Sequence, residues 1–245
     1  MIDDRVFLGF PINFKQIFYI YPPTVNEVSS NEHFNIFHSL FTMTQEELED
    51  AYLGDGKHEV APSPFEYLLM NYYQDDTVRQ YILEGFKCFL HEPVTIEPEL
   101  KMILIGVEEE YLDIDRDLEN PRLLKEEDYF DFQNEIRTVM GDEKIEPPDP
   151  DEDPRVKRIK AKGRYRDRLK AKRQQGPTFG TLLAAICCMK IGLTPLNIGE
   201  MSYACVHWLI AMGQQQESYD IDIRSLLAGA DSKKIKPKYW IKNLD

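Results

Sequence analysis

Residues 147–176 read PPDPDEDPRVKRIKAKGRYRDRLKAKRQQG, and this stretch determines how the chain is divided. Its first part, 147–154, contains only proline, aspartate and glutamate, whereas residues 155–173 contain eleven lysines and arginines and one acid, Asp167. Proline lacks a backbone donor and restricts the residue before it, so the acidic part is not expected to be helical. The basic part has no proline and many helix formers. The stretch therefore predicts a linker followed by a charged helix.

The sequence on either side of this linker, 142–177, predicts two folded regions. Region 1–141 combines helix signals with an apolar strand at 17–21 and an apolar, alternating hairpin over 94–107. Region 178–245 shows helix signals alone. We therefore expect an α+β, mainly α protein with a helical N-terminal domain containing a small sheet, a charged linker helix and a small C-terminal helical packet.

The helices of region 1–141 are predicted from their start and stop signals. Three capping boxes mark helix starts, namely Thr24 with Glu27, Thr44 with Glu47, and Ser63 with Glu66. Apolar stripes predict further helices over 31–43 and after Asp75, and the last helix, about 126–140, ends at Gly141 in the usual C-cap position.

Region 178–245 begins with an apolar short helix and continues with one apolar seam. Asn197, with Glu200 three residues on, predicts the start of the helix that carries the seam. Spacings of 3, 4, 3 and 4 place five side chains on one face: Ile198, Met201, Cys205, Trp208 and Met212. Such a stripe is either part of the packet's own core or a partner-binding face, and two methionines beside a tryptophan suit adaptable binding. A further short helix and a basic, aromatic tail are expected from Asp222 onward.

The absence of known catalytic motifs argues against an enzyme. No phosphate-binding, dinucleotide-binding, metalloprotease or serine-hydrolase motif is present, so we expect no catalytic residues and no cofactor. Residues 113–117, DIDRD, resemble a calcium loop, but Leu118 and Leu124 replace its glycine and glutamate, so no metal is expected. The four cysteines form no C-x-x-C pair and indicate reduced thiols in a cytoplasmic, soluble protein. No apolar run is long enough for a membrane helix.

The basic segment stands out because the whole chain has a net charge of −14. Its eleven cations are Arg155, Lys157, Arg158, Lys160, Lys162, Arg164, Arg166, Arg168, Lys170, Lys172 and Arg173. Three interpretations stay open: phosphate binding to nucleic acid, a solvated helix or one docked on the chain's own acidic surface, and an arm that grips a protein partner. The first has a single interleaved aromatic residue, Tyr165, which is little for stacking on single strands.

Several stretches together resemble bacteriophage tail assembly chaperones of Gram-positive hosts. They are IYPPTVNEV, LFTMTQEELED, SPFEYLL, DPRVKRIKAKGRYRDRLKAK and ICCMKIGLTPLNIGEMSYACVHWLI, which together extend over most of the chain. The segment GLTPLNIGEMSY is the most similar local feature.

This resemblance implies a non-enzymatic protein of the host cytoplasm that binds the tape measure protein before the tail tube assembles around it. That partner is long, helical and apolar. The resemblance implies that the seam contacts it, and that the basic arm contacts either its acidic stripes or another copy of the chaperone. Nucleic-acid binding through residues 155–173 is the alternative function.

Overall fold

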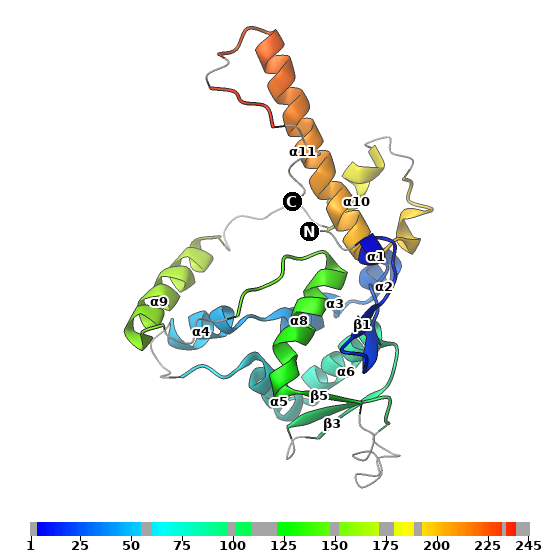
Figure 1. Ribbon diagram of the computed structural model, residues 1–245, viewed down its shortest axis with the longest axis vertical. Helices are drawn as coiled ribbons and strands as arrows, with labels where there is room; N and C mark the ends of the chain where they lie inside the picture. The colour runs from blue at the N-terminus through cyan, green and yellow to red at the C-terminus, as the bar shows by residue number, and fades with distance from the viewer. Residues whose placement is uncertain are drawn as a thin grey trace.

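The computed structural model shows a mainly helical protein with two small antiparallel sheets, which confirms the predicted α+β, mainly α class. Figure 1 shows a body from which one long helix, α11 (Tyr203–Leu227), projects. The structure describes residues 4–54, 60–97, 101–108, 122–147, 152–171, 179–188, 193–231 and 234–238.

Helices of four to fifteen residues form most of the body. They are α1 (Asp4–Phe7), α2 (Val25–Ser30), α3 (Phe34–Thr42), α4 (Gln45–Leu53), α5 (Pro64–Gln74), α6 (Asp76–Leu90) and α8 (Glu126–Met140). All three capping boxes are present, with both hydrogen bonds of each formed. The helix predicted over 31–43 begins at Phe34, whereas α8 has the predicted bounds.

Two sheets border these helices. Strands β1 (Ile12–Phe14) and β2 (Phe18–Ile20) form one hairpin, and β3 (Val94–Glu97), β4 (Met102–Ile105) and β5 (Leu123–Lys125) form a three-stranded sheet. The predicted hairpin over 94–107 is confirmed, with Val94 opposite Ile105. The sequence analysis missed β1 and β5, because neither lies in an apolar and aromatic run as long as the one at 17–21 that contains β2.

An aromatic cluster forms the core of the body. Phe132 of α8 is fully buried at its centre and contacts rings from two strands and two helices, namely Phe14, Phe18, Phe41 and Phe86. These rings come from elements far apart in sequence, so the core joins β1 and β2 to α3, α6 and α8.

The C-terminal half begins with α9 (Pro154–Ala171) and continues through α10 (Phe179–Cys188), the 3₁₀ helix η2 (Ile198–Glu200) and α11. The predicted start of the seam helix is wrong. Asn197 Oδ1 accepts the N–H of Thr194 at 2.8 Å and makes no helix cap, whereas Ser202 caps α11 by accepting the N–H of Cys205 at 3.2 Å. The separate short helix expected from Asp222 is also wrong, because α11 continues without a break to Leu227.

The C-terminal elements contact the body through α2 and α8. Val25 of α2 lies in a second small core with Ile186, Ile198, Val206 and Ile210, and its N–H donates to Met201 O at 3.0 Å. At the end of α8, Gly141 has a φ of +79° and a virtual Cβ there would lie 3.2 Å from Ala204 Cα of α11. This close approach and the left-handed φ both favour glycine. The boundaries 1–141, 142–177 and 178–245 stay predictions.

Candidate protein-interaction site

The predicted seam begins inside the molecule. Ile198 and Cys205 are buried, and Met201 packs against the second small core from the C-terminal end of η2. Trp208 packs against the main core and stacks on Phe7 of α1, with ring centroids 5.8 Å apart and an interplanar angle of 6°. The structure therefore places the first four seam residues against the chain's own elements, while their role in binding a partner stays a prediction.

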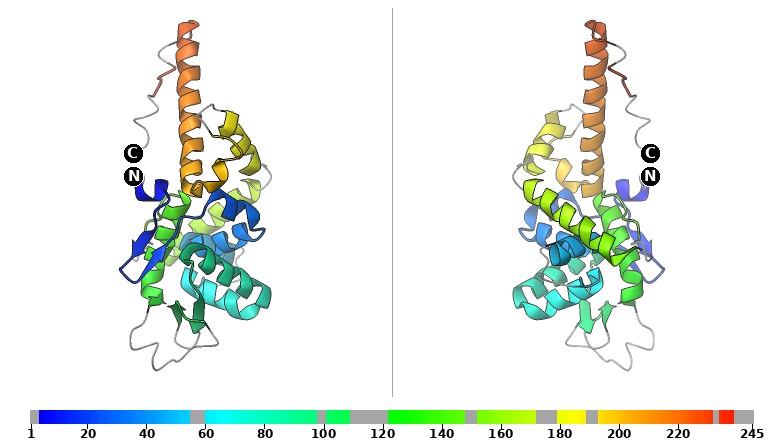
Figure 2. Two further views of the ribbon diagram at one scale, coloured as in Figure 1. Left: turned by 90° about the vertical axis from the view of Figure 1, so that its right-hand side faces the viewer. Right: turned by 90° about the vertical axis from the view of Figure 1, so that its left-hand side faces the viewer.

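Beyond Trp208 the same face of α11 leaves the body. The buried residues of α11 are confined to Ala204, Cys205, Val206 and Ile210, all in its first eight positions. Residues 211–227 extend for about 25 Å at 1.5 Å per residue, and Figures 1 and 2 show them projecting from the body.

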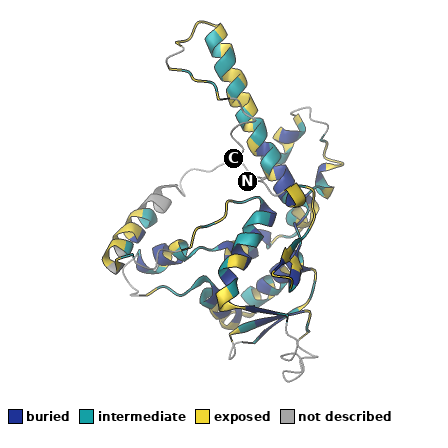
Figure 3. Cartoon of the chain, in the orientation of Figure 1, coloured by how far each residue is buried: buried dark blue, intermediate teal, exposed yellow. Residues whose placement is uncertain are grey.

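The projecting part of α11 continues the seam. With 3.6 residues per turn, Met212, Tyr219, Ile223 and Leu226 lie on the face that carries Cys205 and Trp208 nearer the body. All four are half-buried, and Figure 3 shows the outer part of the helix as half-buried and exposed residues. The seam is thus longer than the sequence analysis predicted, because the helix itself is longer.

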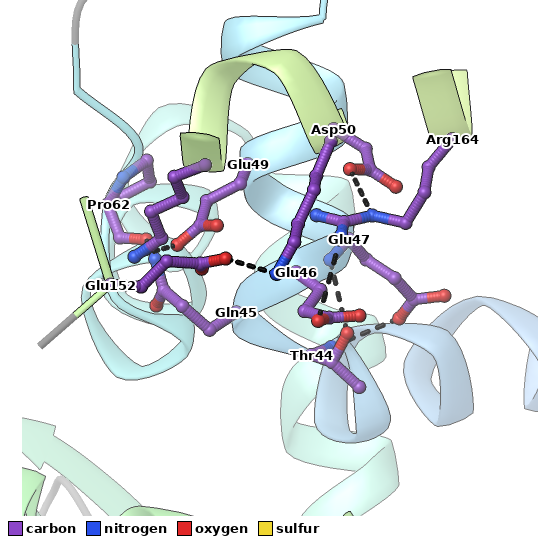
Figure 4. A network of polar contacts seen from close by, with 11 residues as sticks. Thr44, Gln45, Glu46, Glu47, Glu49, Asp50, Pro62, Glu152 and Arg164 are labelled. Atoms are coloured by element: carbon purple, nitrogen blue, oxygen red, sulfur yellow. Dashed lines mark hydrogen bonds and ion pairs between the residues drawn. The ribbon is translucent and has the colours of Figure 1, made fainter. Parts of the chain in front are cut away.

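The predicted basic arm is α9, and it lies on the acidic helix α4 (Figure 4). Arg164 Nε donates to Asp50 Oδ1 at 2.8 Å, and Lys157 Nζ lies 2.7 Å from Glu49 Oε1. Lys160 forms an ion pair with Glu152, just before the helix. Lys157 and Arg164 thus attach α9 to α4, whereas Lys160 pairs within the predicted linker region, and binding of a partner by the arm stays a prediction.

The contact between α4 and α9 buries charge around one small side chain. Ala161 of α9 is fully buried, and the side chains of Glu49 and Asp50 are only 4% and 1% exposed. Buried carboxylates require such partners, because an unpaired buried charge is very costly. Ala161 thus gives α9 one fully buried position, although charged residues surround the helix.

The other predicted arm residues divide into two sets. Arg155 and Lys162 are exposed on the side of α9 away from this contact, together with Ile159. Of the rest, the structure does not describe the side chains of Arg158, Arg166, Arg168 and Lys170, and Lys172 and Arg173 lie outside the described residues.

A cleft of about 620 Å³ lies beside this contact, and we call it the α4–α9 cleft. It is lined by the first turns of α4, α5 and α8, by residues 145–147 and by α9. Asn134 of α8 fixes one wall, because its side chain accepts the N–H of Ile145 at 2.8 Å and donates to Ile145 O at 3.2 Å. Sequence reasoning missed this cleft, although four carboxylates within residues 46–50 were a visible signal for a basic partner.

Two of the described cysteines have raised pKa values. Burial raises the pKa of the Cys88 thiol to about 12 and also raises that of Cys205, so neither is an activated nucleophile. Among the described residues, no cluster of His, Cys, Asp or Glu has the geometry for a metal ion. The DIDRD segment lies outside them. In the same part of the chain, no helix combines the length and apolar character needed to cross a membrane.

Comparison with known families gives one match. No curated protein and no solved structure is detectably similar to this chain. Residues 170–245 match the family described as the YomV second domain, and YomV is a protein from a prophage region of Bacillus. The match begins near the end of α9 and includes α10, η2 and α11. The region that carries the projecting helix is therefore similar to a phage-related domain.

Proposed function

We propose that this protein is a non-enzymatic phage assembly factor, a tail assembly chaperone that binds the tape measure protein in the host cytoplasm. The observation that carries the proposal is the seam on α11, which begins in the body and continues along a helix that projects from it. A second helix laid along Met212, Tyr219, Ile223 and Leu226 would bury an apolar stripe at coiled-coil spacing.

The position of this helix supports a protein partner rather than a small ligand. Its outer part is convex and narrow, which suits a long helical partner and offers no enclosed volume. The similarity of residues 170–245 to a phage-related domain supports an assembly role. The acidic charge of the chain supports it as well, because self-repulsion would keep a complex with an apolar partner soluble.

Nucleic-acid binding through residues 155–173 is the alternative function, and it has less support. Lys157, Lys160 and Arg164 are already paired with carboxylates, so fewer cations are available for phosphates. Arg155 and Lys162 are exposed and keep the alternative open to test.

The test is affinity purification of the tagged protein from phage-producing cells at about 300 mM salt, where phosphate contacts are weak. The tape measure protein, identified by mass spectrometry, is expected with the wild type. Tyr219→Ala/Ile223→Ala is expected to reduce its yield at least tenfold, because truncating central interface residues commonly costs about 2 kcal/mol. The matched control is Gln214→Ala/Glu217→Ala, two exposed residues on the opposite face of the same helix, which is expected to retain the partner.

Two results would overturn the proposal. One is equal loss of the partner with both double variants. The other is recovery of nucleic acid in a low-salt wash that disappears when the lysines and arginines of 155–173 are replaced by glutamine, with no tape measure protein at either salt concentration. The second result would establish the alternative function.

A further inference from the structure

We propose that the α4–α9 cleft binds the lysine-rich C-terminal segment, residues 233–242, of a second copy of the chain. The cleft has the volume of a typical binding site for a few side chains. Its position beside α9, away from the seam on α11, makes this site independent of the proposed chaperone surface.

The charge of the cleft favours a cationic occupant. Five glutamates line it against two lysines, Lys157 and Lys160. The five are Glu46, Glu49, Glu126, Glu146 and Glu152. Both lysines are already engaged, one with Glu49 and the other with Glu152. Glu126 and Glu146 are exposed at the cleft, and although Glu126 Oε1 accepts the Ser63 hydroxyl at 3.0 Å, both carboxylates can pair with further cations.

The cleft also has an apolar floor. Phe65, Tyr129 and Phe130 line it together with Pro64 and Pro147. The hydroxyl of Tyr129 is buried and has no hydrogen-bond partner in the described part of the chain. A buried hydroxyl without a partner is uncommon and is satisfied when a ligand supplies an acceptor or donor. Aromatic rings beside carboxylates suit an occupant that combines apolar side chains with ammonium groups, since both attract cations.

One wall of the cleft already forms an ion pair with a lysine of the chain itself. Lys157 Nζ lies 2.7 Å from Glu49 Oε1, and that carboxylate is almost completely buried. A lysine-bearing segment from another chain would use the same chemistry at Glu126 and Glu146.

The C-terminal segment is the matching occupant within this sequence. Positive charge is concentrated in two stretches, 155–173 and 233–242, and the first already lies against α4. The second reads KKIKPKYWIK, with five lysines, no acid and two adjacent aromatic residues. In its described part, the side chains of Lys234, Lys236 and Lys238 are exposed. The lysines of this segment therefore complement the glutamates of the cleft, and its apolar and aromatic residues complement the apolar floor.

The test uses the full-length protein and a fluorescently labelled synthetic peptide of residues 231–245, with binding measured by fluorescence anisotropy at about 50 mM salt. Saturable binding is expected. Glu126→Gln/Glu146→Gln is expected to raise the Kd about fivefold or more, because it removes two carboxylates that would pair with lysines of the peptide. The matched control, Glu32→Gln/Glu217→Gln, removes the same charge at exposed positions outside the cleft and is expected to change the Kd less than about twofold.

Two further peptides and one sedimentation experiment complete the test. The peptide with its five lysines replaced by glutamine is expected not to bind, and a peptide of the same composition in scrambled order is expected to bind more weakly. Sedimentation of the wild-type protein should show self-association that an excess of the free peptide reverses. The proposal is overturned if the native peptide does not bind, or if the protein stays monomeric at all concentrations while the peptide binds. It is also overturned if the scrambled peptide binds as tightly as the native one, or if the control variant raises the Kd as much as Glu126→Gln/Glu146→Gln does.

Discussion

Two contacts between helices in this protein are made in opposite ways. The contact of α3, α6 and α8 consists of phenylalanine rings, with Phe41 and Phe86 4.6 Å apart at their centroids and both rings within 6.2 Å of Phe132. The contact of α4 and α9 consists of ion pairs around Ala161. The first gains its free energy from removing apolar surface from water, which salt hardly weakens. The second depends on charges that salt screens.

The two contacts have different roles: the aromatic contact forms the core of the fold, whereas the charged contact attaches one helix, α9, to it. The aromatic contact joins helices that precede the three-stranded sheet in the sequence, α3 and α6, to the helix that follows it, α8, and it forms the core of the body. The charged contact holds α9, in which charged residues outnumber apolar ones and which is followed by the region that matches the YomV second domain. We expect α9 to detach from α4 under conditions that leave the body folded.

The largest expected effect is on the aromatic side of the comparison. Phe132→Ala should lower the free energy of unfolding by about 4 kcal/mol, because it leaves a cavity among several rings. Urea denaturation measures this effect. Phe130→Ala is the control on the same helix, since Phe130 is only half-buried, and should cost less than half as much. Equal costs would show that the ring cluster is not the centre of the core.

The next effect is on the charged side. Glu49→Gln and Lys157→Gln should each lower the free energy of unfolding by about 1–2 kcal/mol, because each leaves one partner of a mostly buried pair without its counter-charge. The lysine is about one-third exposed, which keeps this cost below that of a fully buried pair. The double variant should cost less than the sum of the two. Additive costs in this double-mutant cycle would show that the two side chains do not interact.

Salt should distinguish the two contacts without any substitution. Raising sodium chloride from about 0.1 to 1 M shortens the screening length from about 10 to 3 Å. Amide hydrogen exchange in residues 155–165 of α9 should then accelerate roughly three- to tenfold, whereas exchange in α8 should stay unchanged. Amides of α9 that exchange at the same rate in both salts would show that packing around Ala161, and not charge, holds this helix.

The sequence predicted local features better than these contacts. The capping boxes at Thr24, Thr44 and Ser63 and the C-cap at Gly141 were predictable, because each signal lies within four residues of the structure that it specifies. The partners of the basic segment were not, because Arg164 and Asp50 are 114 residues apart and no local rule pairs them. The start of α11 was missed for a related reason, since Asn197 and Ser202 are both good caps and tertiary contacts at Val25 and Pro23 decide between them.

The smallest expected effect comes from an ion pair of intermediate character, inside the body but partly exposed. Asp142 Oδ2 lies 3.4 Å from His38 Nε2. Burial by itself would raise the pKa of Asp142, but the close contact with His38 and the positive charges of His38, Arg137 and His207 outweigh it, so its pKa lies below the ordinary value of 3.8. A carboxylate with a lowered pKa contributes stability above its ordinary pKa, and this contribution is lost as the pH falls through 3.8 toward the folded value.

Asp142→Asn should therefore cost less than about 1 kcal/mol at pH 7. Because the wild type loses the contribution of Asp142 in acid, the difference between the two proteins should shrink as the pH falls from 5 to 3. Urea denaturation across this range measures the effect, and Asp220→Asn, at an exposed position on the projecting part of α11, is the control. If both variants follow the same pH profile, His38 does not stabilise the Asp142 carboxylate. In that case the partly buried pair of Asp142 and His38 contributes no more than a surface charge. A short distance between opposite charges would then be insufficient to explain how α9 is held on α4.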